Sequence, residues 1–259
     1  MNIQKKILDL KLNENEIAIF WLGNASFAIK TDRGKIIYID PYLSNYAEKL
    51  YGFKRIFPSP IKPPQVKADY ILISHEHGDH LDMDSIPQIM KQQGIKLVAP
   101  EPCIDKCEEY SIKEDKLIEV NNGDIEEFTG FKLITVFADH GDLAPQAVGY
   151  ILDFGTSKIY YTGDTAYTPE KMETAFSMKP EIVIPPINGK FNNMDPWEAA
   201  MLVRDCKAKI AIPAHFCMFA EHNGNPGEFV KYIKQINNTK CKLITMGDYY
   251  IYNALEGGN

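Results

Sequence analysis

Six ionisable side chains fall within the eight residues HEHGDHLD, which begin at His75 and end at Asp82. Three of the six histidines of the chain lie in this stretch. Imidazoles and carboxylates crowded this closely cost desolvation free energy unless a partner compensates them. Neutral imidazole and carboxylate are ligands of divalent transition metals, so a bound cation would make the crowding favourable. The stretch therefore predicts a metal site.

The order of these residues allows several of them to point at one place. His75 and His77 are two apart at the end of a strand predicted at 71–74, so both side chains leave on the same side. After a tight turn, Asp79 and His80 can aim back toward the same point. One ion needs only three or four of these groups as ligands, so the stretch alone could supply one complete site.

Three further candidate ligands follow other predicted strands. His140 lies in FADHGD, Asp164 in YTGDT and His215 in IPAHF. Taken singly, His140 or His215 would more often be a core or surface residue than a ligand. The chain ends of strands are where sites in α/β proteins assemble, so we expect all three beside the first cluster. Five histidines and two aspartates suffice for two ions that share a bridging carboxylate and a bridging water.

The elements that must position these side chains form a mixed α/β pattern. Strands are predicted at 17–21, 27–30, 36–40, 71–74, 95–99, 124–128, 131–137, 148–154, 159–162, 181–185, 210–213, 243–246 and 249–252. Helices are predicted at 85–94, 104–110, 169–178, 196–206 and 227–235. Strand-rich and helix-alternating blocks occur in both halves, which indicates a duplicated β-and-α unit. Two sheets with helices outside would bury such strands, and we predict one domain over residues 1–259.

A long polar and proline-rich segment at 44–67 exceeds ordinary connections. Segments of this kind are often lids over a site or contacts with a partner. A solvated loop explains its composition equally well. We expect it near the site, where it would cover the entrance or contribute to a homo-oligomer.

Composition restricts the partners. The 259 residues carry a net charge of −7, so no global basic field draws in nucleic acid. No apolar run approaches the ~20 residues of a membrane helix. The start, MNIQKKILDLKLNENE, lacks the apolar core of a secretory signal, and five scattered cysteines are typical of reduced thiols. We therefore expect a cytoplasmic protein that acts on a small molecule rather than on nucleic acid or a membrane.

The motifs SHEHGDHLD, ADHGD, TGDT and PAH, in this order, resemble the successive ligand motifs of the metallo-β-lactamase superfamily. The resemblance runs from WLGNASF to the final predicted strands. It implies a four-layer αβ/βα sandwich, with two mixed sheets face to face, helices outside and a dinuclear site at one edge. The implied ligands are His75, His77 and His140 for the first ion, Asp79, His80 and His215 for the second, and Asp164 between them. The ions would be zinc or manganese, with iron as a further option.

Three segments resemble one branch of this superfamily in particular. WLGNASF, INGKFNNMDPWEAA and PAHFCMFAEHNGNPGEF are similar to the L-ascorbate-6-phosphate lactonase-like branch. Leu81 and Asp82 stand where glyoxalase II-like members have a glycine pair. Asn24 departs from the histidine that many relatives place in its glycine-flanked position, which leaves its role open.

The ligand set predicts a hydrolase. Two ions would lower the pKa of a shared water, and the hydroxide would attack a carbonyl or phosphoryl centre while a metal stabilises the developing oxyanion. We expect a small ester, lactone or phosphoester, with a sugar-phosphate lactone as one option. Asp79 and Asp164 are the predicted catalytic residues, and Asp79 or a metal-bound water would return a proton to the leaving alkoxide.

Other functions stay open. The nearest alternative is a phosphodiesterase acting on a small or lipid-derived phosphodiester. Flavodiiron-type relatives use the fold for redox chemistry, but they carry an acidic residue where this chain has His77, and a flavin domain. Ribonuclease Z and β-CASP nucleases share the ligand motif and carry added nucleic-acid-binding segments that this chain lacks. A scaffold without catalysis would have no reason to keep all seven ligands.

Several residues have two readings from the sequence alone. Asp40 and Asp82 could orient histidine ligands, or could serve as turn or cap residues. Candidate substrate contacts, each of which could equally be a core, surface or loop residue, are Asn24, Tyr42, Asn188, Lys190 and His222.

Overall fold

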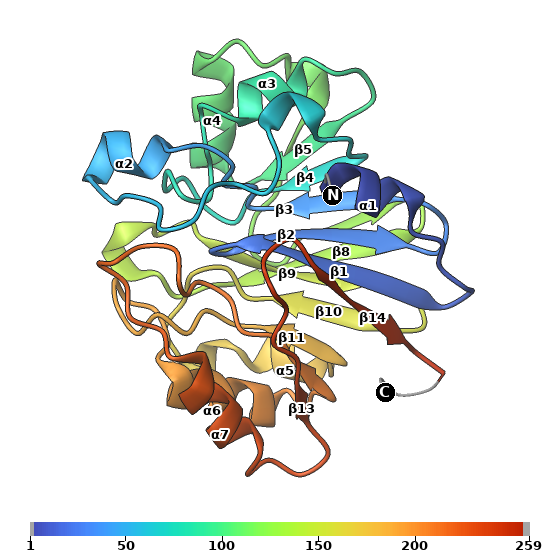
Figure 1. Ribbon diagram of the computed structural model, residues 1–259, viewed down its shortest axis with the longest axis vertical. Helices are drawn as coiled ribbons and strands as arrows, with labels where there is room; N and C mark the ends of the chain where they lie inside the picture. The colour runs from blue at the N-terminus through green and yellow to red at the C-terminus, as the bar shows by residue number, and fades with distance from the viewer. Residues whose placement is uncertain (1–2, 256–259) are drawn as a thin grey trace.

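Two sheets of seven strands each form the centre of the molecule (Figure 1). The computed structural model describes residues 3–255, so residues 1–2 and 256–259 of the predicted domain lie outside it. The first sheet contains β1 (Glu16–Gly23), β2 (Ser26–Thr31), β3 (Ile36–Ile39), β4 (Tyr70–Leu72), β5 (Lys96–Ala99), β6 (Leu117–Glu119) and β14 (Tyr249–Asn253). The second contains β7 (Ile125–Phe128), β8 (Phe131–Phe137), β9 (Val148–Asp153), β10 (Lys158–Tyr161), β11 (Ile182–Ile184), β12 (Ile210–Ala211) and β13 (Lys240–Cys241).

The two sheets have the same internal order. In the first, β14, β1, β2 and β3 pair antiparallel, and β3 to β6 pair parallel. In the second, β7 to β10 pair antiparallel, and β10 to β13 pair parallel. The segments after β3 and β10 therefore occupy equivalent places, and so do those after β4 and β11. This is the duplicated unit that the sequence indicates.

Helices cover the outer faces of the sandwich. The first sheet carries α1 (Ile3–Asp9), α3 (Ile86–Met90) and α4 (Glu101–Glu109), whose apolar residues share a core with its outer face. The second carries α5 (Glu173–Ser177), α6 (Pro196–Asp205) and α7 (Pro226–Ile233), seen with it in the lower half of Figure 1. Successive residues of β1 alternate between these two cores, as period-two geometry requires. The predicted sandwich of two mixed sheets with outer helices is confirmed.

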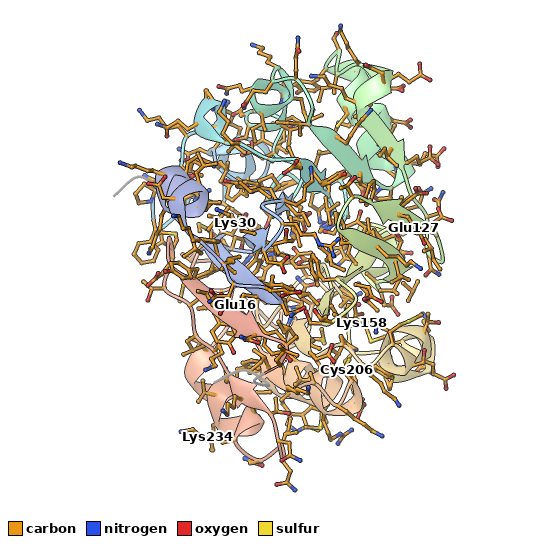
Figure 2. The ribbon with its side chains drawn as sticks, turned by 90° about the vertical axis from the view of Figure 1, so that its right-hand side faces the viewer. Glu16, Lys30, Glu127, Lys158, Cys206 and Lys234 are labelled. Atoms are coloured by element: carbon orange, nitrogen blue, oxygen red, sulfur yellow. The ribbon has the colours of Figure 1, made fainter. Side chains whose placement is uncertain are left out.

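The first helix was not predicted. A lysine from β2 holds its end, because Nζ of Lys30 donates hydrogen bonds to the carbonyl oxygens of Ile7, Leu8 and Leu10 at 2.7–2.8 Å. Lys30 is labelled in Figure 2. An ammonium group carries three donors and no acceptor, so this one is fully used by the carbonyls that a helix end leaves unpaired. The short α1 is thereby tied to the first sheet.

One predicted strand is wrong. Residues 243–246 are irregular, and the last strand of the second sheet is instead the two-residue β13. The segment from Cys241 to Tyr249 leaves the second sheet and joins the first, so it cannot pair along either. Leu243 is 52% exposed and Ile244 is buried, an alternation that the sequence shares with a strand although neither sheet takes this segment up. The apolar run therefore reflects a crossing between sheets.

The segment at 44–67 is partly helical. It contains α2 (Tyr46–Tyr51) and a 3-10 turn, η1 (Pro63–Gln65), and Figure 1 shows α2 standing away from the first sheet. Two other short 3-10 turns, η3 (Gly141–Leu143) and η4 (Pro169–Lys171), follow β8 and β10. Within the described residues, no helix is both long and apolar enough to cross a membrane.

Candidate metal centre

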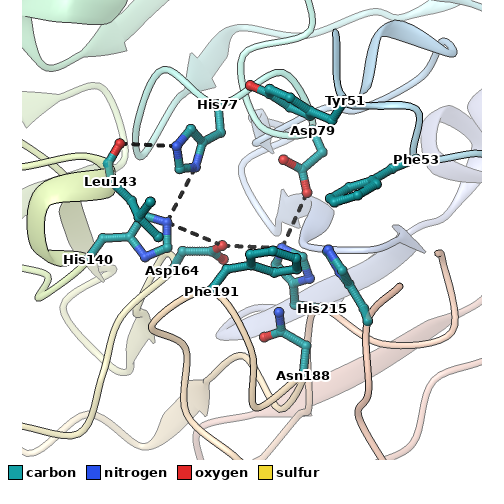
Figure 3. Close-up of a pocket in the computed structure, with 11 residues that line it drawn as sticks. Tyr51, Phe53, His77, Asp79, His140, Leu143, Asp164, Asn188, Phe191 and His215 are labelled. Carbon is teal, nitrogen blue, oxygen red and sulfur yellow. Dashed lines mark hydrogen bonds and ion pairs between the residues drawn. The ribbon is translucent and has the colours of Figure 1, made fainter. Parts of the chain in front are cut away.

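The seven predicted ligands lie together at one edge of the two sheets. Figure 3 shows five of them, His77, Asp79, His140, Asp164 and His215. The cluster from His75 to His80 follows β4, His140 follows β8, Asp164 follows β10 and His215 follows β12. The described residues form three overlapping groups in which all ligand atoms are within 4.8 Å of one another. They are His75, His77 and His140; Asp79, His80 and His215; and His75, His80 and Asp164.

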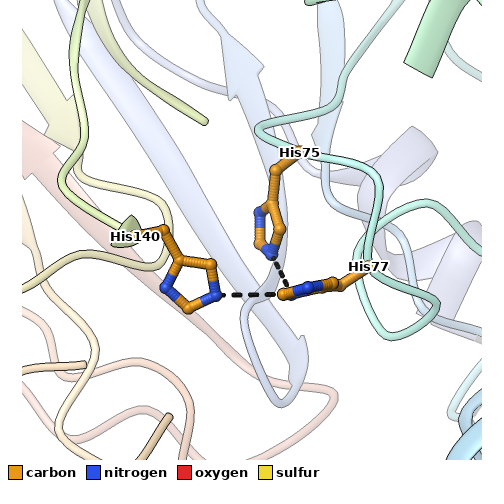
Figure 4. A group of neighbouring side chains, drawn as sticks. All are labelled: His75, His77 and His140. Carbon is orange, nitrogen blue, oxygen red and sulfur yellow. Dashed lines mark hydrogen bonds between the residues drawn. The ribbon is translucent and has the colours of Figure 1, made fainter. Parts of the chain in front are cut away.

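In the first group, three ring nitrogens face one another (Figure 4). Nε2 of His75 lies 2.9 Å from Nδ1 of His77, and Nε2 of His140 lies 3.3 Å from the same atom. Burial lowers the pKa of His75 far below its usual range and the pKa of His140 to about 4, so both rings are neutral at pH 7. Ring nitrogens that face one another at such distances need a shared proton or a cation between them. This donor set fits a divalent metal.

The second group combines imidazoles with carboxylates. Nε2 of His215 lies 3.3 Å from Oδ2 of Asp79 and 3.3 Å from Oδ2 of Asp164. Burial alone would lower the pKa of His215, but these carboxylates raise it to about 9. Burial would raise the pKa of Asp79, yet His80 and His215 hold it far below its usual range. The protons on these imidazoles thus supply the positive charge that a cation would otherwise bring.

Asp164 reaches both groups. Its Oδ1 lies 3.4 Å from Nε2 of His80, and its Oδ2 lies 4.0 Å from Nε2 of His140. Nδ2 of Asn193 donates a 2.7 Å hydrogen bond to Oδ2 and fixes the carboxylate. Gly163 has a φ of +65°, and a Cβ there would lie 2.8 Å from the carbonyl oxygen of Val148. Only glycine therefore permits the turn that points Asp164 at the centre.

A buried network behind the centre orients two of the histidines. Oδ2 of Asp40 lies 2.7 Å from Nδ1 of His80, and the same carboxylate accepts hydrogen bonds from the Ser74 amide, the Ser74 hydroxyl and the Tyr161 hydroxyl. Oγ of Ser74 lies 2.9 Å from Nδ1 of His75. Because both Nδ1 atoms are engaged, the Nε2 atoms are left for the centre. Of the two readings of Asp40, orientation of a histidine is the one the structure shows.

Asp82, in contrast, serves as a turn and cap residue. It accepts hydrogen bonds from the amides of Leu43 and Ser44 and from the hydroxyls of Ser44 and Ser85, which precedes α3. It therefore ties residues 43–44 to the start of a helix. No described contact joins it to a histidine ring, so the interpretation of Asp82 as an orienting group is wrong.

Comparison with known proteins agrees with this geometry. The model of the Beta-lactamase superfamily domain matches residues 18–215, a span that contains all seven candidate ligands. The chain belongs to the beta-lactamase superfamily. The superfamily assignment made from the motifs is thus confirmed, and the lactonase-like branch stays a prediction.

Superfamily relatives share nearly the full length of the chain. A UPF0173 metal-dependent hydrolase of Aeropyrum pernix is 30% identical over 249 residues, covering 90% of this chain and 96% of that protein. One from Thermodesulfovibrio yellowstonii is 32% identical over 250 residues, covering 89% and 90%.

Solved structures show the same fold. Igni18, a metallo hydrolase from Ignicoccus hospitalis, has a TM-score of 0.72 at 21% identity, with 92% of this chain and 98% of that chain covered. The metallo-beta-lactamase fold protein YhfI from Bacillus subtilis has a TM-score of 0.69 at 14% identity, with 92% and 99% covered. The metallo-β-lactamase fold expected from the motifs is confirmed.

A cavity of about 230 Å³ opens over the candidate metal centre (Figure 3). It is lined by Tyr51, Phe53, His77, Asp79, His140, Leu143, Asp164, Asn188, Phe191, His215 and His222. Of the five predicted substrate residues, Asn188 and His222 belong to this lining. Burial lowers the pKa of His222 to about 4, so its ring is neutral at pH 7.

The other three predicted substrate residues lie elsewhere. Lys190 is exposed outside the lining, and Tyr42 is buried against Phe219 and beneath the guanidinium of Arg55. Asn24 is fully buried behind the centre, where its Nδ2 donates a 3.0 Å hydrogen bond to Oδ2 of Asp79. The backbone carbonyl oxygen of Asn24 also accepts a hydrogen bond from the backbone amide of His215. Asn24 is therefore a positioning residue for two candidate ligands.

The lining also contains residues that the sequence analysis did not identify. Tyr51 and Phe53 come from the 44–67 segment, which was expected near the entrance without a role for either ring. Leu143 and Phe191 come from short turns after His140 and after Lys190. Nothing in their local sequence distinguishes them, because they meet only through the fold.

Proposed function

We propose that this protein is a metal-dependent hydrolase that holds two divalent cations and cleaves a small ester or lactone. The observation that carries the proposal is the position of Asp164, which reaches both groups of donors. Support also comes from the relatives, whose name is metal-dependent hydrolase. The first ion would be held by His75, His77 and His140. The second would be held by Asp79, His80 and His215, and Asp164 would contact both ions.

The ions would be zinc or manganese, with iron as a further candidate. When bound, they would lower the pKa of water and polarise the oxygen of the electrophile. The protein's own groups orient the reactants. Asp79 and Asp164 are the two carboxylates that line the cavity, so both face a bound substrate. In ester or lactone cleavage the leaving alkoxide needs a proton. Asp79, held from behind by Asn24, is the group we assign to take up the proton that the attacking water loses and to pass it to the alkoxide.

Replacement of Asp164 by Asn tests this function. We expect Asp164→Asn to hold fewer than two ions per chain, as measured by elemental analysis, and to lose hydrolysis of a lactone panel. Asp153→Asn, at the end of β9 and away from the lining, serves as the control. Full metal content and full activity in Asp164→Asn would refute the proposal.

A phosphodiester substrate is the alternative, because the same donor set serves phosphoryl transfer. Parallel assays of the metal-loaded protein with the lactone panel and with bis-p-nitrophenyl phosphate separate the two. A clear preference for the phosphodiester would replace the lactone proposal and keep the metal centre.

A further inference from the structure

Four aromatic rings form one wall of the cavity mouth, and we call Tyr51, Phe53, Phe191 and His222 the aromatic collar. Phe53 lies at its middle, with ring centroids 5.6 Å from Phe191, 5.5 Å from His222 and 5.9 Å from Tyr51. Phe191 and His222 are themselves 5.2 Å apart. These separations are those of interacting aromatic pairs. The collar joins three distant parts of the chain above the metal centre.

The collar presents apolar surface that a folded protein would otherwise bury. Phe191 is 44% exposed and Tyr51 is 45% exposed, and Leu143 across the mouth is 49% exposed. Phe191 also has a φ of +55°, a left-handed conformation that costs free energy for a residue other than glycine. An exposed ring held in an unfavourable backbone conformation at the mouth indicates a binding role.

No lysine or arginine among the described residues lines the mouth. The acidic residues of the lining are Asp79 and Asp164. Lys190, next to Phe191, is exposed outside the lining. Nη1 of Arg55 donates to the carbonyl oxygens of Tyr42 and Ser44 at 2.9 and 3.2 Å, so its guanidinium is held within the 44–67 segment. A substrate phosphate would therefore find neither a lysine nor an arginine to pair with here.

A neutral polar group lies deeper in the cavity. Asn188 is fully buried, and its Oδ1 has no hydrogen-bond partner among the described residues. Its Nδ2 makes only a long contact, 3.4 Å, to the carbonyl oxygen of Lys190. Figure 3 shows Asn188 and His215 among the residues that line the cavity. A buried amide with unused hydrogen-bonding capacity suits an uncharged polar group of a ligand.

We propose that the substrate is a small uncharged ester or lactone with an aromatic or bulky apolar group, which packs against the aromatic collar while Asn188 binds a neutral polar atom. This inference rests on the proposed hydrolase function and narrows its substrate class. The cavity of about 230 Å³ suits one ring rather than a long chain. The proposed substrate class excludes the phosphorylated lactone that the resemblance to the lactonase-like branch suggests.

The test compares three lactones with the metal-loaded protein: dihydrocoumarin, which carries a benzene ring; δ-valerolactone, which has no aromatic ring; and phosphorylated gluconolactone. We expect kcat/KM to be at least about tenfold higher for dihydrocoumarin than for either of the others. Phe191→Ala should raise KM for dihydrocoumarin about tenfold, leave kcat nearly unchanged and leave δ-valerolactone unaffected.

Phe57→Ala is the matched control. Phe57 is 47% exposed, similar to Phe191, but lies outside the lining, so its loss should leave all three substrates unaffected. Preference for the phosphorylated lactone, or an unchanged KM in Phe191→Ala, would overturn the substrate class and leave the hydrolase function standing. Failure of the wild type to cleave any ester or lactone would overturn the proposed function, and this inference with it.

Discussion

The carboxylate of Asp40 lies directly behind His80, with Oδ2 2.7 Å from Nδ1 of the ring. Both side chains are fully buried. Asp40 follows β3, and Asp164 follows β10 at the equivalent place in the second sheet. The two halves of the fold thus supply carboxylates at matching positions. Asp40 supports the candidate ligand His80 from behind, whereas Asp164 faces the cavity.

Replacing Asp40 by Asn should weaken metal binding. An amide can donate to Nδ1 of His80, which would favour the tautomer that carries its proton on Nε2, the atom that faces the centre. We expect metal affinity to fall about 10–100-fold, the usual effect of losing a group that orients a ligand. Titration of the metal-free protein against a competing chelator measures this.

Asp82→Asn provides the comparison, because Asp82 is equally buried but holds a helix start rather than a histidine. It should lower the free energy of unfolding and leave metal affinity within about twofold. Equal metal affinity in Asp40→Asn and the wild type would show that the Asp40–His80 contact has no effect on the ligand.

Stability of the metal-free protein should depend on pH in two opposite ways. His140 has a folded pKa of about 4, below the ~6.5 of an unfolded histidine, so the unfolded chain takes up the extra proton as the pH falls from 6.5 to 4. The free energy of unfolding therefore falls on the acid side. His215 has a folded pKa of about 9, so its contribution is full below pH 6.5 and is lost as the pH rises through 9.

The metal-free protein should therefore be most stable near pH 6.5, as measured by urea unfolding with a chelator between pH 4.5 and 9.5. His215→Gln should reduce the alkaline decline, and His80, whose pKa is also raised by neighbouring carboxylates, accounts for what remains. Added zinc should also remove the alkaline decline, because cations then replace the protons between the carboxylates. A profile that does not change between pH 6.5 and 9.5 in the wild type would contradict this.

Replacing Lys30 by Met should destabilise the fold without touching the metal centre. The three hydrogen bonds from its ammonium to the end of α1 would be lost and the carbonyls left without that partner. We expect a loss of about 3 kcal/mol in the free energy of unfolding, measured by urea denaturation. Lys5→Met, an exposed change on the same helix, should cost less than about 0.5 kcal/mol. Similar values for the two variants would argue against the cap.

Replacing Gly163 by Ala should disturb the centre through the backbone. The new Cβ would lie 2.8 Å from the carbonyl oxygen of Val148, so the turn that carries Asp164 must shift. We expect a loss of about 2 kcal/mol or more in stability and a metal content below two ions per chain by elemental analysis. Gly155→Ala has a similar left-handed φ of +84° but open space around it, so it should cost only the backbone strain and keep both ions.

The dense ligand motifs made the centre predictable, because seven candidate metal ligands each placed just after a strand can converge only at one edge of a sheet. Elements with little apolar signal were not predictable. The edge strand β6 is half-exposed over three residues, and α1 depends on Lys30 from another element. Asp40 and Asp82 could not be told apart, because their partners Tyr161 and Leu43 are set by the fold. The aromatic collar was hidden for the same reason.

The pairing of β14 with β1 has a consequence for the order of assembly. During synthesis the first sheet lacks this border strand until residues 249–253 have left the ribosome, and the backbone groups of Ile17 and Ile19 that face it remain available to other chains. His215 is also made late, long after the cluster that begins at His75. A nascent chain that has not reached His215 would therefore carry six of the seven candidate ligands and an open sheet edge, and a chaperone that shields that edge would protect the unfinished protein from aggregation.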